Sequence, residues 1–338
     1  MAALRDDCGE IVFGRLPVVV RYSDKFAAQK IGNDWRPTTS DFNDTGSVDI
    51  ESMLGQLKYA VKYILGRDQA GRHYTVFPDD TFLVSYPKSG NTWVRFLLAN
   101  LLYPNETVGF ANINRLLPAP GVLSKRFLRR LPRPRILKSH ETFDPRFRKI
   151  IYLVRDPRDV AVSEYHFDLK KRYIEPDVTL EQFVKRFIAG ETSSYGSWWE
   201  HAAGWIAARH GNPAFLLVRY EDLLAEPVGE TGKIAEFLGI QAGPERLQAA
   251  VQRSSADRMR KLEKQQADQW TGTKNTRQEI PFVRSAKSGG WKESLPRRSA
   301  EEIEVAWAPL LNFLGYPLLT PELENKTMPP WIRTGQPL

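Results

Sequence analysis

The chain has 338 residues, 42% of them hydrophobic and 26% charged, a balance that predicts a folded globular protein with a sizeable core. Lys and Arg outnumber Asp and Glu by 48 to 40, and the net charge of +8 favours anionic partners, from nucleotides to nucleic acid, acidic lipids or sulfated glycans. The single cysteine, Cys8, excludes internal disulfides and cysteine-based metal sites and favours the cytoplasm, and no apolar run is long enough for a membrane span or a signal peptide.

The first 79 residues are predicted to be an N-terminal extension that packs on the core. Within residues 49–67, apolar side chains recur on one side of a helical pattern, namely Met53, Leu57, Val61 and Ile64. The alternative for this helix is a role at a membrane surface. A single domain is predicted at residues 80–317, and residues 318–338 are predicted to form a C-terminal tail.

Four short apolar runs with the composition of β-strands follow, separated by helical patterns, at residues 81–86, 135–138, 150–154 and 215–220. This alternation predicts an α/β fold in which a parallel sheet is flanked by helices. Helices are predicted after Trp93, from a capping-box pattern at Thr179 and Gln182, and over residues 300–315. The basic segment 123–135 is interpreted as a solvated loop, with the steering of an anionic acceptor as the alternative.

The turn after the first run reads YPKSGNTW, residues 86–93, and leads from a strand into a helix. Such a turn aims backbone N–H groups and the positive end of the helix dipole at one point, which is where phosphate binds. Lys88 adds a positive charge, two hydroxyl side chains add donors, and Gly90 lets the backbone approach an anion without a Cβ in the way. The flat ring of Trp93 is suited to stack on a base. We therefore predict a nucleotide phosphate site at this turn.

Two alternatives stay open for the turn. A Walker A loop carries its lysine after the second glycine, whereas Lys88 precedes the only glycine of the turn. The run at 150–154 leads into Arg155 and not into the magnesium-binding Asp of a Walker B motif. A P-loop kinase that uses a nucleoside triphosphate and magnesium is therefore the weaker interpretation. The other alternative is an ordinary strand-turn-helix in which Ser and Thr only cap the helix.

Two further segments carry cations that suit an anion site. In KIIYLVRDPRDVAVSEYHF, Arg155 follows a strand and Ser163 lies in the next helix, so both are able to reach a second phosphate. Arg155 could equally form an ion pair with Asp156 or Asp159. The segment PFVRSAKSGGWK is typical either of a basic loop that folds over an anion or of a solvated loop, and its cations are Arg284, Lys287 and Lys292.

Six segments occur in the order seen in the soluble sulfotransferases that use 3′-phosphoadenosine 5′-phosphosulfate (PAPS). They are YPKSGNTW, LKSHE, KIIYLVRDPRDVAVSEYHF, YGSWWEHAAGW, LLVRYEDLLAEP and PFVRSAKSGGWK. The chain resembles that family over about residues 80–317, and six segments in one order are far more specific than any one of them. The resemblance implies a P-loop-like fold, PAPS as co-substrate, 3′-phosphoadenosine 5′-phosphate (PAP) as product, and no metal requirement.

The resemblance also implies roles for individual residues. The family's loop around the 5′-phosphosulfate is matched by Lys88, Ser89, Gly90, Asn91, Thr92 and Trp93. The pair that holds the 3′-phosphate is matched by Arg155 and Ser163. Further donor contacts are implied for Tyr220, Ser254, Arg284 and Ser285. The catalytic positions are matched by His140 as general base, by Lys88 at the bridging oxygen, and by Lys138 beside them.

Some positions depart from the family pattern. Ala256 stands where an aromatic residue often covers the adenine, and Ser285 and Ala286 replace a Lys-Gly pair after Arg284. The family's short dimer motif is broken by Pro296 and its neighbour, so the oligomeric state is left open.

We therefore expect an enzyme that transfers a sulfuryl group from PAPS to a hydroxyl of a small molecule or glycoconjugate. The acceptor must lose a proton as it attacks, and an imidazole suits that role near neutral pH, which favours His140. Lys88 would stabilise charge on the leaving oxygen in the transition state. The alternative from another class is a basic polyanion-binding protein without turnover, whose binding would be sensitive to salt. No nucleic-acid partner and no membrane span are expected.

Overall fold

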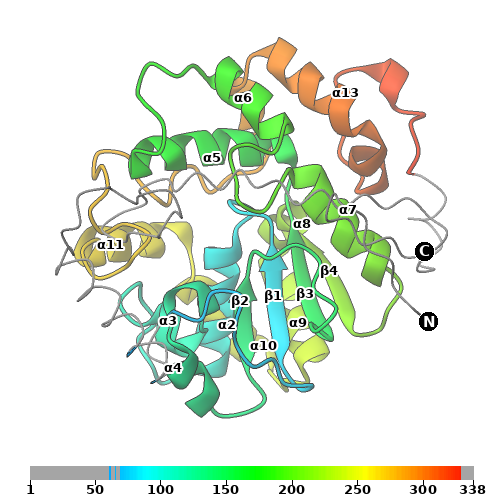
Figure 1. Cartoon of the computed structure of the whole chain (residues 1–338). Coiled ribbons are helices and arrows are strands. Elements are labelled where there is room, and N and C mark those ends of the chain that lie inside the picture. The colour runs from blue at the N-terminus through cyan, green and yellow to red at the C-terminus, as the bar shows by residue number, and fades with distance from the viewer. Residues whose placement is uncertain (1–60, 62–64, 66–68, 329–338) are drawn as a thin grey trace, which may run out of the picture. The chain divides into compact units, whose positions relative to one another are not determined.

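The computed structural model describes residues 61, 65 and 69–328. The chain divides into residues 1–57 and 58–338, and all described residues belong to the second unit. Four parallel strands form one sheet in the order β2-β1-β3-β4 (Figure 1), and they are β1 (Thr81–Ser85), β2 (Ile136–Ser139), β3 (Lys149–Val154) and β4 (Phe215–Arg219). The predicted α/β class with a parallel sheet is confirmed. The strand bounds differ from the predicted runs by one residue at most.

Side chains of the central strands alternate between two buried clusters, because successive residues of a strand point to opposite faces of the sheet. Phe82, Val84 and Tyr152 belong to one cluster, whereas Leu83 and Leu153 belong to the other. All five side chains are at most 1% exposed. Burial on both faces explains why these strands read as nearly continuous apolar runs.

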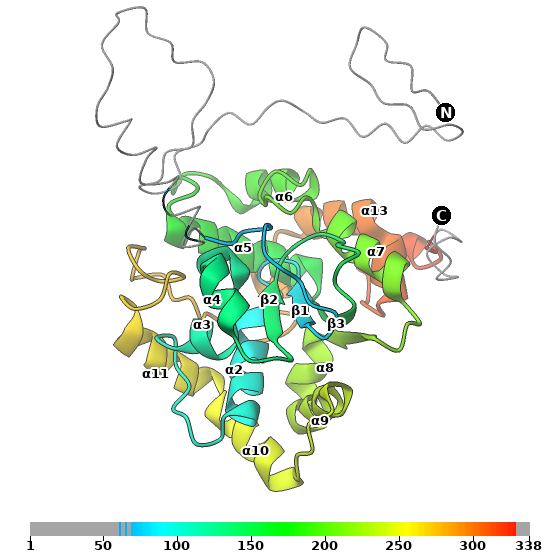
Figure 2. The ribbon, with the colours of Figure 1, turned by 60° about the horizontal axis from the view of Figure 1, so that its bottom comes forward.

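Helices cover each face of the sheet. The first cluster is completed by α5 (Pro157–Lys171), α6 (Leu180–Ile188), α7 (Trp198–Arg209) and α13 (Arg297–Phe313). The second is completed by α2 (Asn91–Leu102), α8 (Tyr220–Ala225), α9 (Pro227–Leu238) and α11 (Ala256–Gln266). Figures 1 and 2 both show α5, α6 and α13 grouped apart from α2, α9 and α10. The remaining elements are α3 (Ile113–Leu116), η1 (Pro120–Val122), α4 (Lys125–Arg130), α10 (Pro244–Arg253), α12 (Trp291–Ser294) and η2 (Pro321–Leu323).

The predicted helix starts are largely confirmed. At α6 the Thr179 side chain accepts a hydrogen bond from the N–H of Gln182, and the Gln182 side chain accepts one from the N–H of Thr179. This reciprocal capping box satisfies two N–H groups that the first turn leaves without partners. The last helix, α13, begins at Arg297, three residues before the predicted range.

The basic segment 123–135 is not a loop throughout, and this prediction was wrong. Residues Lys125–Arg130 form α4, and the side chain of Ser124 caps it by accepting a hydrogen bond of 3.2 Å from the N–H of Phe127. Serine is one of the residues that favour this cap position. Arg135 is buried and forms an ion pair with buried Asp80, so this cation belongs to the core and not to a solvated run.

Both predicted extensions are described only in part. The helix predicted over residues 49–67 lies outside the described residues, apart from 61 and 65. Ala70 is buried and its N–H donates a hydrogen bond of 2.8 Å to the carbonyl of Leu123, so the end of the extension packs on the domain. In the tail, the amide of Asn312 on α13 donates hydrogen bonds to the carbonyls of Leu323, Glu324 and Lys326. Among the described residues no helix combines the length and the apolar character needed to cross a membrane.

Candidate active site

The turn after β1 contains two left-handed residues. Lys88 has a φ of 63° and Gly90 has a φ of 97°, and α2 begins directly after them at Asn91. The N–H groups of Asn91, Thr92 and Trp93 have no acceptor among the described residues. Since the first turn of a helix leaves such N–H groups without intrahelical partners, they point with the positive end of the helix dipole toward one place. This geometry is suited to binding an anion.

Gly90 is required at this turn for a second reason, which the sequence did not reveal. A Cβ at this position would lie 2.6 Å from Cδ2 of the Tyr220 ring. Tyr220 is 4% exposed, it lies edge to face with Trp93 at 5.6 Å between ring centroids, and the Arg155 guanidinium lies 4.3 Å from its centroid. Tyr220 therefore packs against the turn, and its ring leaves no room for a Cβ at position 90, so this position requires glycine.

Two polar side chains of the turn, Ser89 and Asn91, are buried. Asn91 donates through Nδ2 to the carbonyl of Leu83 at 3.3 Å and to the hydroxyl of Ser85 at 3.1 Å, so it ties the start of α2 to the end of β1. The hydroxyl of Ser89 is buried and has no hydrogen-bond partner in the described part of the chain. A buried hydroxyl without a partner costs free energy, which a bound acceptor group would recover.

Arg155, directly after β3, joins this turn to the basic loop of residues 281–290, which precedes α12. Its guanidinium donates to the carbonyl of Lys88 at 3.3 Å and to the carbonyl of Lys287 at 3.0 Å, and its Nε is buried without a partner. Burial lowers the pKa of Arg284, and the neighbouring positive charge of Arg155 lowers it further. The charge of Arg155 thus disfavours that of Arg284, and a bound anion would offset this repulsion.

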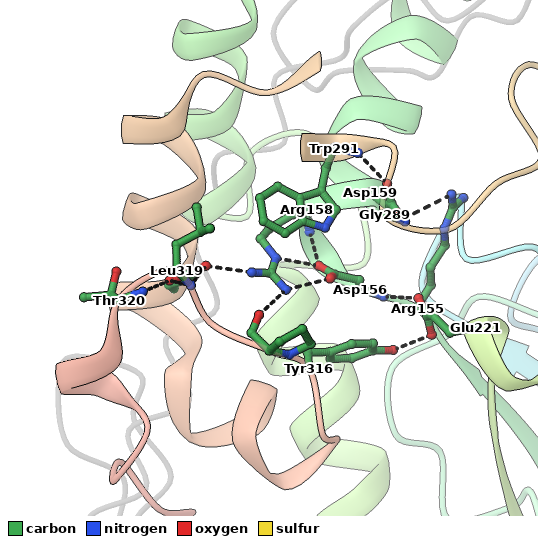
Figure 3. A network of polar contacts seen from close by, with 12 residues as sticks. Arg155, Asp156, Arg158, Asp159, Glu221, Gly289, Trp291, Tyr316, Leu319 and Thr320 are labelled. Atoms are coloured by element: carbon green, nitrogen blue, oxygen red, sulfur yellow. Dashed lines mark hydrogen bonds and ion pairs between the residues drawn. The ribbon is translucent and has the colours of Figure 1, made fainter. Parts of the chain in front are cut away.

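The carboxylate of Asp159 anchors the same loop to α5 (Figure 3). It accepts hydrogen bonds from the N–H of Gly289 at 2.8 Å and from the N–H of Trp291 at 2.9 Å, and it lies 3.8 Å from Arg155. Of the two ion pairs considered for Arg155 from the sequence, the one with Asp159 is therefore present. A single carboxylate fixes both the arginine and the loop beside it.

A fully buried ion pair joins α5 to α13. Arg158 lies 2.6 Å from Glu304 on α13, and both side chains are 0% exposed. Arg158 also pairs with Asp156 at 2.7 Å and stacks on the Trp291 ring at 4.0 Å from its centroid. Glu304 in turn accepts hydrogen bonds from the N–H of Leu319. Because a buried charge without its partner is costly, these contacts hold α5, α13 and the loop together.

Lys88 has an environment that the sequence did not predict. Its ammonium lies 4.1 Å from the ring centroid of Phe167 and 4.4 Å from that of Phe282. Burial lowers its pKa to about 7, against the opposing effect of the nearby carboxylates of Glu164 and Asp168. Burial likewise raises the pKa of Asp168 to about 7. These two carboxylates lie one turn apart on α5, and their i, i+4 spacing was the signal that sequence reasoning missed.

His140 follows β2, and its ring faces the end of β1. Its Nδ1 lies 2.7 Å from the carbonyl oxygen of Ser85, which can only accept, so Nδ1 carries the proton and Nε2 carries the lone pair. Burial, and next the positive charge of Lys138, lower the pKa of His140 well below its usual value. Burial and the charge of Arg95 lower the pKa of Lys138 to about 7. The ring of Tyr195 lies 5.8 Å from that of His140 and forms a wall beside it.

The three serines predicted outside the turn, Ser163, Ser254 and Ser285, lie in different environments. Ser163 lies half-buried on α5, and Ser285 lies on the loop next to Arg284. Ser254 is fully buried, donates to the carbonyl of Ala250 at 2.8 Å and accepts from the amide of Asn100 at 3.0 Å. Since Asn100 lies near the C-terminal end of α2, Ser254 is about 14 Å along that helix from the turn at its start. The hydroxyl of Ser254 thus joins α2 to α10, and its contact with the base stays a prediction.

A cavity of about 180 Å³ lies elsewhere, between α4 and the segment before β1. It is lined by His73, Tyr74, Thr75, Lys125, Leu128, Arg129 and Arg135, none of which is a predicted site residue. Among the described residues no three His, Cys, Asp or Glu side chains are placed to share a metal ion.

Two cationic segments and a helix start therefore converge at the carboxyl ends of β1 and β3, the point at which this strand order reverses direction. Parallel α/β folds bind nucleotide phosphates at such a point, so fold and site define a phosphate-binding α/β protein. The sequence over residues 78–315 matches the model of the sulfotransferase domain. The chain belongs to the PAPS-dependent sulfotransferase family, and the resemblance of its six segments is confirmed.

Individual relatives agree with this assignment. The chain is 32% identical to sulfotransferase 1A1 of Rattus norvegicus over 272 residues, which cover 73% of this chain and 90% of that protein. It is 29% identical to a 3-beta-hydroxysteroid sulfotransferase of Cavia porcellus over 254 residues, which cover 72% and 87%. Retinol dehydratase in complex with androsterone and the inactive cofactor PAP has a similar fold, with a TM-score of 0.57, 21% identity, and coverage of 78% and 88%. A mouse sulfotransferase, SULT7A1, complexed with PAP gives a TM-score of 0.56 at 23% identity, with coverage of 70% and 86%.

Proposed function

We propose that this chain transfers a sulfuryl group from PAPS to a hydroxyl of a small molecule. The observation that carries the proposal is the position of Arg155. Its guanidinium contacts the carbonyl of Lys88, in the turn before the N–H groups of α2 that lack acceptors among the described residues, and the carbonyl of Lys287 in the basic loop. The buried hydroxyl of Ser89 and the buried Nε of Arg155 have no partner among the described residues, and both fit phosphate or sulfate oxygens. PAPS, when bound, supplies the sulfuryl group and PAP as the leaving group.

The donor would be held at both ends by the residues of this site. Arg155, Ser163 and Arg284 would hold the 3′-phosphate, and the turn from Lys88 to Trp93 would hold the 5′-phosphosulfate. An anion near Lys88 raises its pKa from about 7, so the lysine would be charged when the leaving oxygen needs stabilisation.

His140 is proposed as the general base. Its Nδ1–H is held by the carbonyl of Ser85, which leaves the lone pair of Nε2 to accept the proton of the acceptor hydroxyl. The lowered pKa keeps this ring neutral at pH 7, so the base is ready before the acceptor arrives.

A flat, apolar molecule with a hydroxyl is the proposed acceptor class. Tyr195 supplies an aromatic wall beside His140, and two of the matched proteins act on or bind steroids according to their names, a hydroxysteroid sulfotransferase and a dehydratase with bound androsterone. A phenol or steroid alcohol fits this setting better than a glycoconjugate. A cytoplasmic location is proposed from the single cysteine.

Donor binding is tested by calorimetry in buffer that contains a metal chelator. We expect PAP to bind with micromolar or tighter affinity, and ATP to bind at least tenfold more weakly, whether or not magnesium is present. Tighter binding of ATP with magnesium would point instead to a kinase. Binding of heparin without binding of PAP would point to a polyanion-binding protein.

Turnover is tested with radiolabelled PAPS against a panel of phenols, steroid alcohols and sugars. We expect His140→Ala to lower turnover by about 10² to 10⁴ with little change in PAP affinity, because a general base contributes that much to rate. His73→Ala, an exposed histidine outside the site, is the matched control. Equal turnover in the two variants would refute the role of His140.

A further inference from the structure

Two ring N–H groups of α7 hold the backbone at and after His140. Nε2 of His201 lies 3.1 Å from the carbonyl oxygen of His140, and Nε1 of Trp205 donates to the carbonyl oxygen of Glu141 at 3.0 Å. His201 and Trp205 are both 0% exposed. Their i, i+4 spacing places them on the same face of the helix, so they reach two successive carbonyl groups.

These carbonyl groups need partners because the sheet no longer supplies them. The last pair in the register of β1 and β2 is Val84 with Ser139, so the chain leaves the ladder just before His140. A buried carbonyl without a donor costs free energy. The side chains of His201 and Trp205 thus replace the missing strand partner of the carbonyl groups of His140 and Glu141.

The carbonyl of His140 fixes the tautomer of His201, and Tyr152 completes the hydrogen bonding of its ring. Nε2 of His201 faces a carbonyl oxygen, which can only accept, so Nε2 carries the proton. Burial lowers the pKa of His201 to about 4, so the ring is neutral and Nδ1 must be an acceptor. The hydroxyl of Tyr152, buried on β3, lies 2.9 Å from Nδ1 and donates to it. The chain of hydrogen bonds therefore runs from Tyr152 through His201 to the backbone of His140.

We infer that His201 and Tyr152 are positioning residues for the reaction, because they fix the carbonyl of His140 while the carbonyl of Ser85 fixes its ring. This inference rests on the proposed role of His140. With backbone and ring both held, Nε2 of His140 points to one place. A shift of about 1 Å in a reacting group can lower a rate by about 10²-fold, so the loss of either bond should act on the chemical step and not on donor binding.

Kinetics of three variants test this positioning. Gln places a donor nitrogen near the position of Nε2 of His201, whereas Leu has none. We expect His201→Leu to lower the single-turnover rate at saturating PAPS and acceptor by about 10- to 100-fold, and His201→Gln to recover most of that loss. PAP affinity should be unchanged in both. Tyr152→Phe removes one hydroxyl and should lower the rate to a similar extent as His201→Leu, with little further loss in the double variant.

Nuclear magnetic resonance of ¹⁵N-labelled histidine rings gives a readout that needs no turnover. In the ligand-free wild type we expect Nε2–H in His201 and Nδ1–H in His140. In Tyr152→Phe we expect His201 to keep its Nε2–H but to show a shifted Nδ1 signal, together with an altered signal of His140. The two ideas can therefore fail separately. Full turnover in His140→Ala would refute the proposed function, whereas the histidine spectra would still test the positioning by His201 and Tyr152. An unchanged His140 signal in both Tyr152→Phe and His201→Leu, or equal losses in His201→Leu and His201→Gln, would overturn the inference. If His201→Leu fails to fold, the spectrum and rate of Tyr152→Phe decide the matter alone.

Discussion

Oδ2 of Asp159 accepts a hydrogen bond of 2.8 Å from the N–H of Gly289, a residue 130 positions further along the chain. The same carboxylate lies 3.8 Å from Arg155, so one side chain at the start of α5 orders both the loop and the arginine proposed for the 3′-phosphate. The loop therefore depends on a contact that forms only when the chain is folded.

Asp159→Asn should weaken PAP binding. The amide keeps one acceptor oxygen and replaces the other by a donor, so either Gly289 or Trp291 loses its partner. One lost hydrogen bond of about 1.4 kcal/mol corresponds to a tenfold weaker affinity, which calorimetry measures. Adenosine 5′-phosphate, which lacks the 3′-phosphate, should lose less than threefold. Asp222→Asn, at an exposed ion pair with Arg219, is the control, and equal losses for both ligands in Asp159→Asn would contradict the assignment.

Gly90→Ala should lower both the unfolding temperature and the affinity for PAP. The added Cβ would lie 2.6 Å from the ring of Tyr220, and φ at this position is 97°, which L-residues rarely adopt. We expect a destabilisation of about 1–3 kcal/mol, to be measured by urea unfolding. Gly204→Ala is the matched control, because a Cβ there meets nothing within 4 Å and alanine favours the helix by up to about 1 kcal/mol. Similar behaviour of the two variants would show that the turn tolerates a side chain.

PAP affinity should fall as the pH rises above 7. Burial lowers the pKa of Lys88 to about 7 in the free protein, so at higher pH the lysine must take up a proton when the anion binds. The affinity contribution of this proton falls by at most tenfold per pH unit. In Lys88→Met that contribution should disappear, leaving the titration of PAP itself and of groups near the site such as Asp168, and calorimetry from pH 6 to 9 measures the difference between the two proteins. Parallel pH profiles would argue against a lysine that titrates in this range.

Lys138→Met should raise the unfolding temperature of the ligand-free protein by a few degrees. Burial lowers the pKa of Lys138 from 10.5 to about 7, so the unfolded chain binds more protons between these values and the lysine destabilises the fold there. That penalty is complete below pH 7 and shrinks as the pH rises toward 10.5. The gain of the variant should therefore be largest at pH 6–7 and smallest near pH 10, as followed by circular dichroism. Lys274→Met, at an exposed lysine, should show no such trend.

The basic segment 123–135 shows where sequence reasoning failed. Its charge and prolines indicated a loop, but six of its residues form α4 because Ser124 caps the helix and Leu128 is buried against the core. Tertiary packing outweighed the local charge pattern. The hydrogen bonds from α7 to the carbonyl groups of His140 and Glu141 could not be predicted either, since His201 and Trp205 meet these groups only after the strands have paired.

The parallel sheet, the strand-turn-helix after β1 and the family could be predicted from the sequence, because hydrophobic period, turn chemistry and motif order can be read directly along the chain. Three other features depend on tertiary contacts: Tyr220 requires a glycine at position 90, Asp159 anchors a loop 130 residues away, and burial lowers the pKa values of Lys88, Lys138 and His140. The physical reason is that contact and desolvation depend on which distant residues exclude water from a group, and no neighbour in the sequence specifies that.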